Sequence, residues 1–198
     1  LKEAQKKRID VSEIHLYDND VMFKEGNVSP AGSSDELLSA AIDMYKEMSP
    51  ETAEFITFMQ ENELYDLLSK EGKAPGGYCT EFSIFKAPFI FSNFNGTSGD
   101  VDVLTHEAGH AFAYYVAARK GIIPDYVSPT IEACEIHSMS MEQFAYPYAE
   151  LFFGEKAFLQ KQKRNSVLKR RQSSARIRIS TNTITPPTPL ILFPTAVW

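Results

Sequence analysis

Apolar residues recur three and four positions apart along much of this chain, which is the spacing of amphipathic helices. Ser49 and Pro50 supply an N-cap and a proline at the first position of one such helix. The pattern therefore predicts a mainly α fold. The predicted helices cover residues 34–48, 50–62, 101–118 and 128–151, and residues 64–69 continue the second of them.

The helical pattern stops at residues 73–77, which include Gly76 and Gly77. Residues 78–85 and 88–93 follow as two short runs rich in aromatic residues, on either side of a short turn at Lys86 and Ala87. Two such runs separated by a turn predict a hairpin. We therefore expect a small antiparallel β element beside the helices.

The helix predicted over residues 101–118 is apolar around much of its circumference and should be buried. Asp100 is placed to cap its first turn, and Gly121 supplies its stop. Within it lies the run His106-Glu107-Ala108-Gly109-His110, whose two histidines share one helical face. Two imidazoles at this spacing beside a carboxylate form the H-E-x-x-H zinc motif, in which the glutamate is the general base. A metal would also satisfy polar groups that are costly to bury unpaired.

A catalytic zinc usually has three protein ligands, so a third one is needed. The metzincin pattern would place glycine at 113 and histidine at 116, but the chain has Ala113 and Val116, which excludes that class. A glutamate on the helix predicted over residues 128–151 is the other common arrangement. Glu132 and Glu135 share one face of that helix and remain alternatives, whereas His137 points away from Glu135.

Three segments in combination resemble one family of metallopeptidases. They are the zinc motif followed by residues 135–142, the run Gly76-Gly77-Tyr78-Cys79-Thr80, and residues 88–94. The combination resembles peptidase family M3, in particular its oligoendopeptidase F type, and extends over most of residues 10–160. The resemblance implies a zincin-like catalytic core with its metal site on two helices.

The same resemblance implies a set of site residues. One Zn²⁺ per chain would be held by His106, His110 and Glu135, which decides between the two candidate glutamates. Glu142 matches a further glutamate position of the family and would contact the ligands rather than the metal itself. Glu107 would accept the proton of a zinc-activated water that attacks the peptide bond. The implied activity is a zinc-dependent metalloendopeptidase.

The implied substrate is a short oligopeptide, held in an extended conformation along the predicted hairpin. Gly76, Gly77 and Tyr78 are the expected substrate-binding residues. Members of the family carry a histidine and tyrosine segment further downstream, whereas this chain has no histidine after His137. The alternative function is therefore a catalytically impaired or inactive zinc-binding fragment that lacks the C-terminal part of the active site.

Charge divides the chain near residue 160. All 26 acidic residues lie within residues 1–160 beside 12 basic ones, a balance of −14, whereas residues 161–198 hold 8 basic residues and no acidic one, a balance of +8. We predict part of a catalytic domain over residues 1–160 and a basic tail rich in threonine and proline over residues 161–198. We expect the tail to be disordered rather than to bind nucleic acid.

The sequence also bears on the location of the protein. No run approaches the roughly 18 apolar residues of a membrane-spanning helix, and no signal peptide is recognisable. Cys79 and Cys134 lie in different segments and predict free thiols rather than a disulfide framework. We therefore expect a cytoplasmic protein without a membrane or nucleic-acid partner. The sequence carries no indication of oligomeric state.

Overall fold

The computed structural model describes residues 2–21, 23–123 and 126–154. Residues 149–154 form a last helical stretch. The predicted boundary near residue 160 and the basic tail lie outside the described residues. The helices are α1 (Lys2–Ile9), α2 (Ser34–Met48), α3 (Pro50–Glu61), α4 (Ser98–Arg119) and α5 (Ile131–Ala145), with the 3₁₀ turns η1 (Leu16–Asp18) and η3 (Tyr146–Tyr148). The strands are β1 (Tyr65–Leu68), β2 (Tyr78–Phe82) and β3 (Ala87–Phe94).

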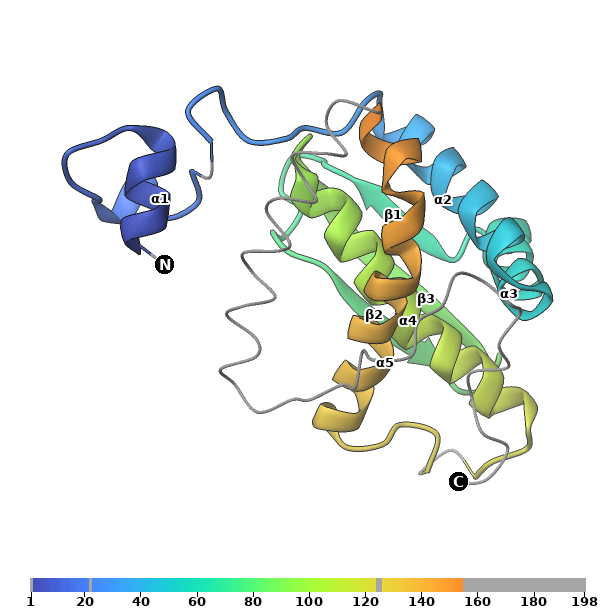
Figure 1. The fold of residues 1–198 in the computed structure, drawn as a ribbon. Helices are drawn as coiled ribbons and strands as arrows, with labels where there is room; N and C mark the ends of the chain where they lie inside the picture. Colours follow the sequence, from blue (N-terminus) through green and yellow to red (C-terminus); the bar gives the residue numbers. More distant parts are fainter. Residues whose placement is uncertain (1, 22, 124–125, 155–198) are drawn as a thin grey trace.

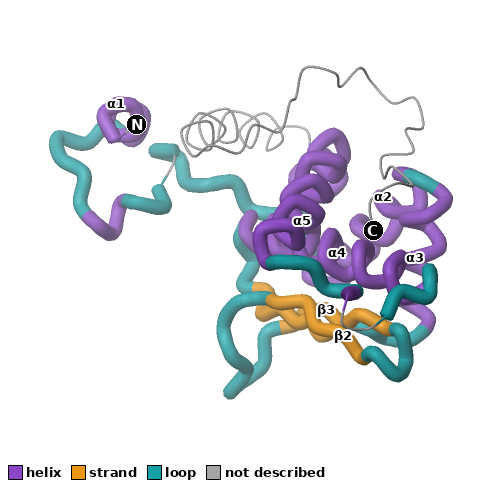
Figure 2. The backbone as a smooth tube through the Cα atoms, turned by 90° about the horizontal axis from the view of Figure 1, so that it is seen from below, coloured by secondary structure: helices purple, strands orange, loops and turns teal. Residues whose placement is uncertain are grey.

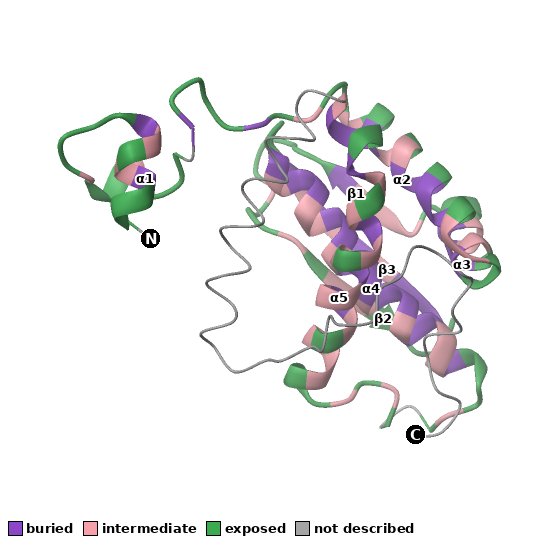
Figure 3. Ribbon diagram, in the orientation of Figure 1, coloured by how far each residue is buried: buried purple, intermediate pink, exposed green. Residues whose placement is uncertain are grey.

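The fold is layered around α4. The sheet lies against one side of α4 and α5 lies against the other, as Figure 2 shows. The pair α2 and α3 packs beside this stack, whereas α1 and η1 lie apart from it (Figure 1). Because α4 is covered on two opposite sides, buried residues occur around most of its circumference (Figure 3). The burial expected from its apolar sequence is confirmed.

The sheet is mixed, so the expectation of an antiparallel β element is only partly right. The strand order is β1-β3-β2, and β2 pairs with β3 in the predicted antiparallel hairpin. The strand β1, in contrast, runs parallel to β3. Since β3 is central, β2 forms one edge of the sheet, next to α4.

The prediction that residues 64–69 are helical is wrong, because these residues contain β1. The helix α3 ends at Glu61, and Glu63 adopts a left-handed conformation with φ 51°, which redirects the chain. The carbonyl of Leu64 then accepts a hydrogen bond from the N–H of Ile90, at 3.0 Å. Pairing with a strand much later in the sequence therefore overrides the local helical pattern.

The start of α4 also differs from the prediction. The helix begins at Ser98 with Thr97 as its N-cap residue, so Asp100 lies in the first turn and is not the cap. The buried Asp100 carboxylate instead accepts hydrogen bonds from the N–H of Asn95, at 3.0 and 3.1 Å to its two oxygens, and from that of Gly96, at 2.7 Å. The end of β3 and the start of α4 are thereby joined.

The helix α5 is shorter than the predicted 128–151. It begins at Ile131 after the N-cap residue Thr130, and it gives way at Tyr146 to η3, which contains Pro147. Proline has no N–H to donate and clashes with the preceding helical turn, so it interrupts the helix before residues 149–154 resume it.

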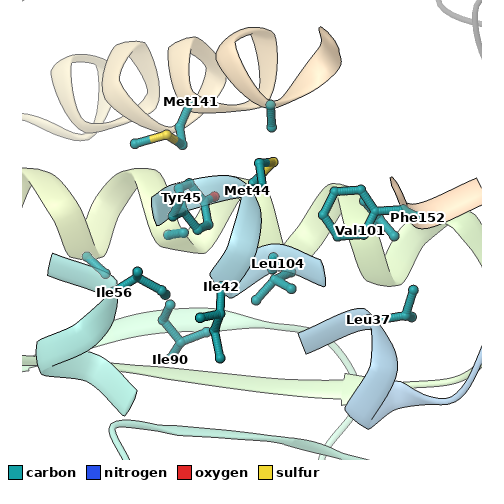
Figure 4. Packing of buried hydrophobic residues seen from close by; sticks show 14 of the residues in the cluster. Leu37, Ile42, Met44, Tyr45, Ile56, Ile90, Val101, Leu104, Met141 and Phe152 are labelled. Carbon is teal, nitrogen blue, oxygen red and sulfur yellow. The ribbon is translucent and has the colours of Figure 1, made fainter. Parts of the chain in front are cut away.

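One hydrophobic core connects the layers (Figure 4). Phe55 of α3 contacts two aromatic rings of α4 edge to face, at centroid distances of 5.4 Å to Phe112 and 5.5 Å to Tyr115. These contacts hold the helical pair α2–α3 against α4. Further buried members of the core are Leu37, Ala41, Met44, Tyr45, Met59, Ile90, Phe94, Leu104, Met141 and Phe152.

Replacement of Asp100 by alanine should lower the free energy of unfolding by about 2 kcal/mol, because two backbone N–H groups lose a charged acceptor. Urea denaturation of the chain measures this loss. Asp43→Ala is the matched control, since Asp43 is exposed on α2, and it should change the stability by less than about 0.5 kcal/mol. Equal losses in both variants would contradict the linking role of Asp100.

Candidate metal centre

His106 and His110 lie on successive turns of α4 and present their rings next to each other. The ring centroids are 4.9 Å apart, and the ring planes are nearly perpendicular at 81°. Their side chains are 26% and 20% exposed, so both rings are partly covered but accessible from one side. The two rings are therefore neighbours on one face of α4, as the four-residue spacing predicts.

Glu135 of α5 reaches both histidines across the helix pair. Its Oε2 lies 3.1 Å from Nε2 of His106, and its Oε1 lies 3.7 Å from Nε2 of His110. One ligand atom from each of the three residues can be chosen so that all lie within 4.8 Å of one another. Glu132, the other candidate, is exposed and is not part of this group.

Glu142 holds the opposite side of the His106 ring. Its Oε1 lies 2.7 Å from Nδ1 of His106, while Nε2 of the same ring faces Glu135. A carboxylate on one ring nitrogen commonly fixes the orientation of a histidine that binds metal through the other. Two imidazole nitrogens and one carboxylate oxygen are also the donors that zinc prefers. The residues present therefore fit a zinc ion.

The electrostatics of the group favour a cation. The hydrogen bond with Glu142 raises the pKa of His106, and the nearby carboxylates of Glu107 and Glu135 add to this, while burial opposes it. Burial and the neighbouring His106 lower the pKa of His110, which keeps that ring in the neutral form that a metal requires. The negative field that favours a proton on His106 would also favour a divalent cation.

Glu107 lies beside this group without joining it. The residue is 8% exposed, and burial, with a contribution from Glu135, raises its pKa, whereas His106 and a backbone hydrogen bond from Cys79 oppose the rise. A carboxyl group whose pKa is shifted towards neutrality can both accept and return a proton. The contact with Cys79 also places the Glu107 side chain next to the edge strand β2.

The thiol of Cys79 itself is not suited to nucleophilic chemistry. Burial first, and then the nearby Glu107, raises its pKa to about 12. The thiolate, which is the nucleophilic form, is therefore scarce at neutral pH.

Gly109, inside the zinc motif, is a point of close approach between α4 and α5. A Cβ atom at this position would lie 2.6 Å from Cα of Ser138, 2.9 Å from Cβ of Met141 and 3.0 Å from the carbonyl oxygen of His137. Only a residue without a side chain fits there. The absence of a side chain at Gly109 thus lets α5 bring Glu135 to the histidines.

The start of β2, where substrate-binding residues were expected, packs directly on α4. A Cβ atom at Gly77 would lie 2.4 Å from Cγ1 of Val103, so a larger residue here would force the Val103 side chain to shift. Gly76 adopts a positive φ of 97° in the preceding turn. Tyr78 is 53% exposed, and its ring stacks on that of Phe91 at 4.9 Å. Tyr78 therefore lies at the start of an accessible edge strand, and Gly76 and Gly77 lead into it.

The loop before Gly76 is fixed to the sheet by two side chains. The Nζ of Lys73 donates hydrogen bonds to the carbonyls of Asp66, at 3.1 Å, and Leu68, at 2.7 Å. The side-chain amide of Asn93 donates to the carbonyl of Ala74 at 3.2 Å. These contacts limit the freedom of the segment that leads into β2.

Two residues of α5 have a relation to the site that sequence reasoning did not anticipate. His137, which was expected to point away from Glu135, is close enough to His110 to lower its pKa. Ser138 donates a hydrogen bond to the Glu135 carboxylate, at 3.1 Å to Oε2. Its position three residues after Glu135, on the same helical face, was the available signal for this contact.

Comparison with known proteins agrees with the geometry. The chain matches the family model described as peptidase family M3 over residues 44–184. The chain belongs to peptidase family M3. The resemblance noted in the sequence, to an M3 metallopeptidase of the oligoendopeptidase F type, is thereby confirmed. A search of curated proteins gives no significant match.

Solved structures of the family share the fold of the chain. A Bacillus anthracis protein assigned as an oligoendopeptidase F is 54% identical, with a TM-score of 0.78, over 81% of this chain and 29% of that protein. PZ peptidase A, solved with an inhibitor, is 53% identical, with a TM-score of 0.77, over 80% of this chain and 28% of its own. A peptidase structure from Chlamydophila abortus, at 17% identity and a TM-score of 0.55 over 74% of this chain and 24% of its own, shares the fold alone.

The chain therefore spans less than a third of the length of these relatives. Among the described residues, no helix combines the length and apolar character required to cross a membrane.

Replacement of Gly109 by alanine should lower the free energy of unfolding by about 1–3 kcal/mol, because the new methyl group meets helix backbone that has no room to move. Alanine favours helix over glycine by about 1 kcal/mol, so a loss can only come from packing. Thermal or urea unfolding measures the effect.

Gly99→Ala on the same helix is the matched control for this prediction. Its Cβ atom would meet a single side-chain oxygen, that of Thr97, at 3.3 Å. The stability of this control should change by less than about 1 kcal/mol. A Gly109→Ala variant as stable as the control would contradict the close approach of α5.

Proposed function

We propose that this chain forms part of the catalytic domain of a zinc-dependent metalloendopeptidase that cleaves short oligopeptides. The observation that carries the proposal is the convergence of His106, His110 and Glu135 beside a buried glutamate, Glu107, next to an edge strand. Membership of peptidase family M3 supports the reaction class. Residues 161–198 are proposed to be a separate, basic tail.

In this proposal, His106, His110 and Glu135 hold one Zn²⁺, and Glu142 keeps the His106 ring in place through Nδ1. Zinc in such a site lowers the pKa of a coordinated water to about 7 and polarises the carbonyl of a peptide.

Glu107 is the proposed general base. Its burial beside the histidines, but outside the ligand group, lets it accept a proton from the attacking water. The raised pKa of this carboxyl group then allows it to deliver the proton to the leaving nitrogen of the cleaved peptide bond. The same side chain thus serves first as base and then as acid.

The proposed substrate lies extended along β2, which is an edge strand and can pair with a peptide through main-chain hydrogen bonds. Gly76, Gly77 and Tyr78 are the proposed substrate-binding residues at the start of this edge. Main-chain pairing tolerates many side chains, which suits a peptidase of broad sequence range. The free thiols Cys79 and Cys134 support a cytoplasmic location.

Metal content and peptide hydrolysis test the proposal together. About one zinc per chain, with hydrolysis that a chelator abolishes and added zinc restores, is the expected result. One zinc per chain without hydrolysis would favour the alternative of an inactive zinc-binding fragment. A folded chain that binds no zinc would contradict the proposal.

Glu107→Gln should retain one zinc per chain but lose turnover by a factor of at least about 10², because the ligands remain and the base is removed. Zinc stoichiometry and the rate of hydrolysis of a fluorogenic peptide measure the two effects. Glu132→Gln, which removes an exposed carboxylate of α5, is the control and should retain both. Unchanged turnover in Glu107→Gln would remove this residue from the mechanism.

The choice between the two candidate glutamates leads to a separate prediction. Glu135→Ala should weaken zinc binding by at least about a hundredfold, since one of three ligands is lost, whereas Glu132→Ala should leave the affinity unchanged. Competition with a chromophoric chelator gives both dissociation constants. If Glu132→Ala were the damaging substitution, the proposed ligand set would be wrong.

A further inference from the structure

Ser138 occupies an unusual position between the proposed metal ligand and the contact of the two helices. It lies on α5 one turn after Glu135, and its exposure is 0%. Its Oγ lies 3.1 Å from Oε2 of Glu135 and 3.1 Å from the carbonyl oxygen of the same residue. Its Cα is also the atom that a Cβ at Gly109 would approach most closely, at 2.6 Å.

A hydroxyl bonded to the carbonyl three residues before it is an ordinary feature of helices. At Ser138 the single hydroxyl hydrogen is shared between this carbonyl and Oε2 of Glu135, which lie at equal distances. Ser140, on the same helix, donates from its hydroxyl to the carbonyl of Ile136. The two serines therefore differ in the one feature that concerns the metal site.

The Glu135 side chain needs such a restraint. It is 42% exposed, although it must keep one geometry to serve both histidines. A glutamate has three rotatable bonds, and holding it in one conformation costs entropy that weakens binding. A donor from a fully buried residue fixes one carboxylate oxygen before the metal arrives, and burial protects the bond from competing water.

We propose that Ser138 is a positioning residue that preorients Glu135 for metal binding, with Gly109 providing the helix contact that keeps Ser138 in place. This inference rests on the proposed zinc site. The hydroxyl of Ser138 holds Oε2 of Glu135 and restricts the carboxylate to conformations that face His106 and His110. The serine itself does not contact the histidines in this role.

The test is the zinc affinity of the full chain, measured by competition with a chromophoric chelator at neutral pH. Ser138→Ala should weaken zinc binding about tenfold. Loss of a residue that orients a metal ligand typically lowers metal affinity by about 10- to 100-fold, and this is the lower end of that range. Ser140→Ala, the matched control, should change the affinity less than about twofold, because its hydroxyl bonds only to backbone. Thermal unfolding of the metal-free variants should give midpoints close to that of the parent chain.

A second measurement separates positioning from general damage to the fold. In a Glu135→Ala background, Ser138→Ala should have no further effect on zinc affinity, because the group it orients is absent. An equal loss of affinity in both backgrounds would overturn the inference, as would unchanged affinity of the single variant. A parent chain that binds no zinc would overturn the proposed function and this inference with it. A parent chain that binds zinc, with unchanged affinity in Ser138→Ala, would overturn this inference alone, so the two failures are distinguishable.

Discussion

The close contact of α4 with α5 at Gly109 is the constraint on which the site depends. The two histidines come from α4 and Glu135 comes from α5, and no local sequence rule places them together. Their separation is set by the distance between two helix backbones, which Gly109 reduces by presenting no side chain. The shift needed to fit a methyl group at this position would exceed the tolerance of about 0.2 Å on metal–ligand distances. The packing of α5 against α4 therefore determines whether the three side chains can share one metal ion.

The layered arrangement also explains how a polar site exists on a buried helix. The α4 helix has the sheet on one side and α5 on the other, so its polar motif is confined to the strip between β2 and α5. Glu107 lies at the deeper side of this strip and the histidines at its more accessible side. Partial burial shifts the pKa values of Glu107 and His110 in opposite directions, both towards the neutral form. Partial burial thus suits Glu107 to proton transfer and His110 to metal binding.

Most of the helical fold could be predicted from the sequence because its signals are local. Ser49 caps α3 where a serine before proline predicts it, and Gly121 adopts the positive φ of 70° expected just beyond α4. The strand β1 could not be predicted, since its partner β3 lies far along the chain and Glu63 must take a left-handed turn to reach it. Helix geometry alone also left Glu132 and Glu135 equivalent. The family resemblance favoured Glu135, and the physical reason for that choice lies in how α5 packs against α4, a property of contact between distant segments.

The carboxylate of Asp100 has a consequence for motion. By accepting two backbone N–H groups at the junction of β3 and α4, it removes the flexible joint that would otherwise separate strand from helix. The hairpin and the helix that carries the two histidines are therefore linked by hydrogen bonds at their junction. Before α5, the hydroxyl of Ser128 donates a hydrogen bond to the Glu81 carboxylate of β2. The candidate ligands therefore belong to two separately anchored parts of the chain, the histidines to the strand–helix unit and Glu135 to α5.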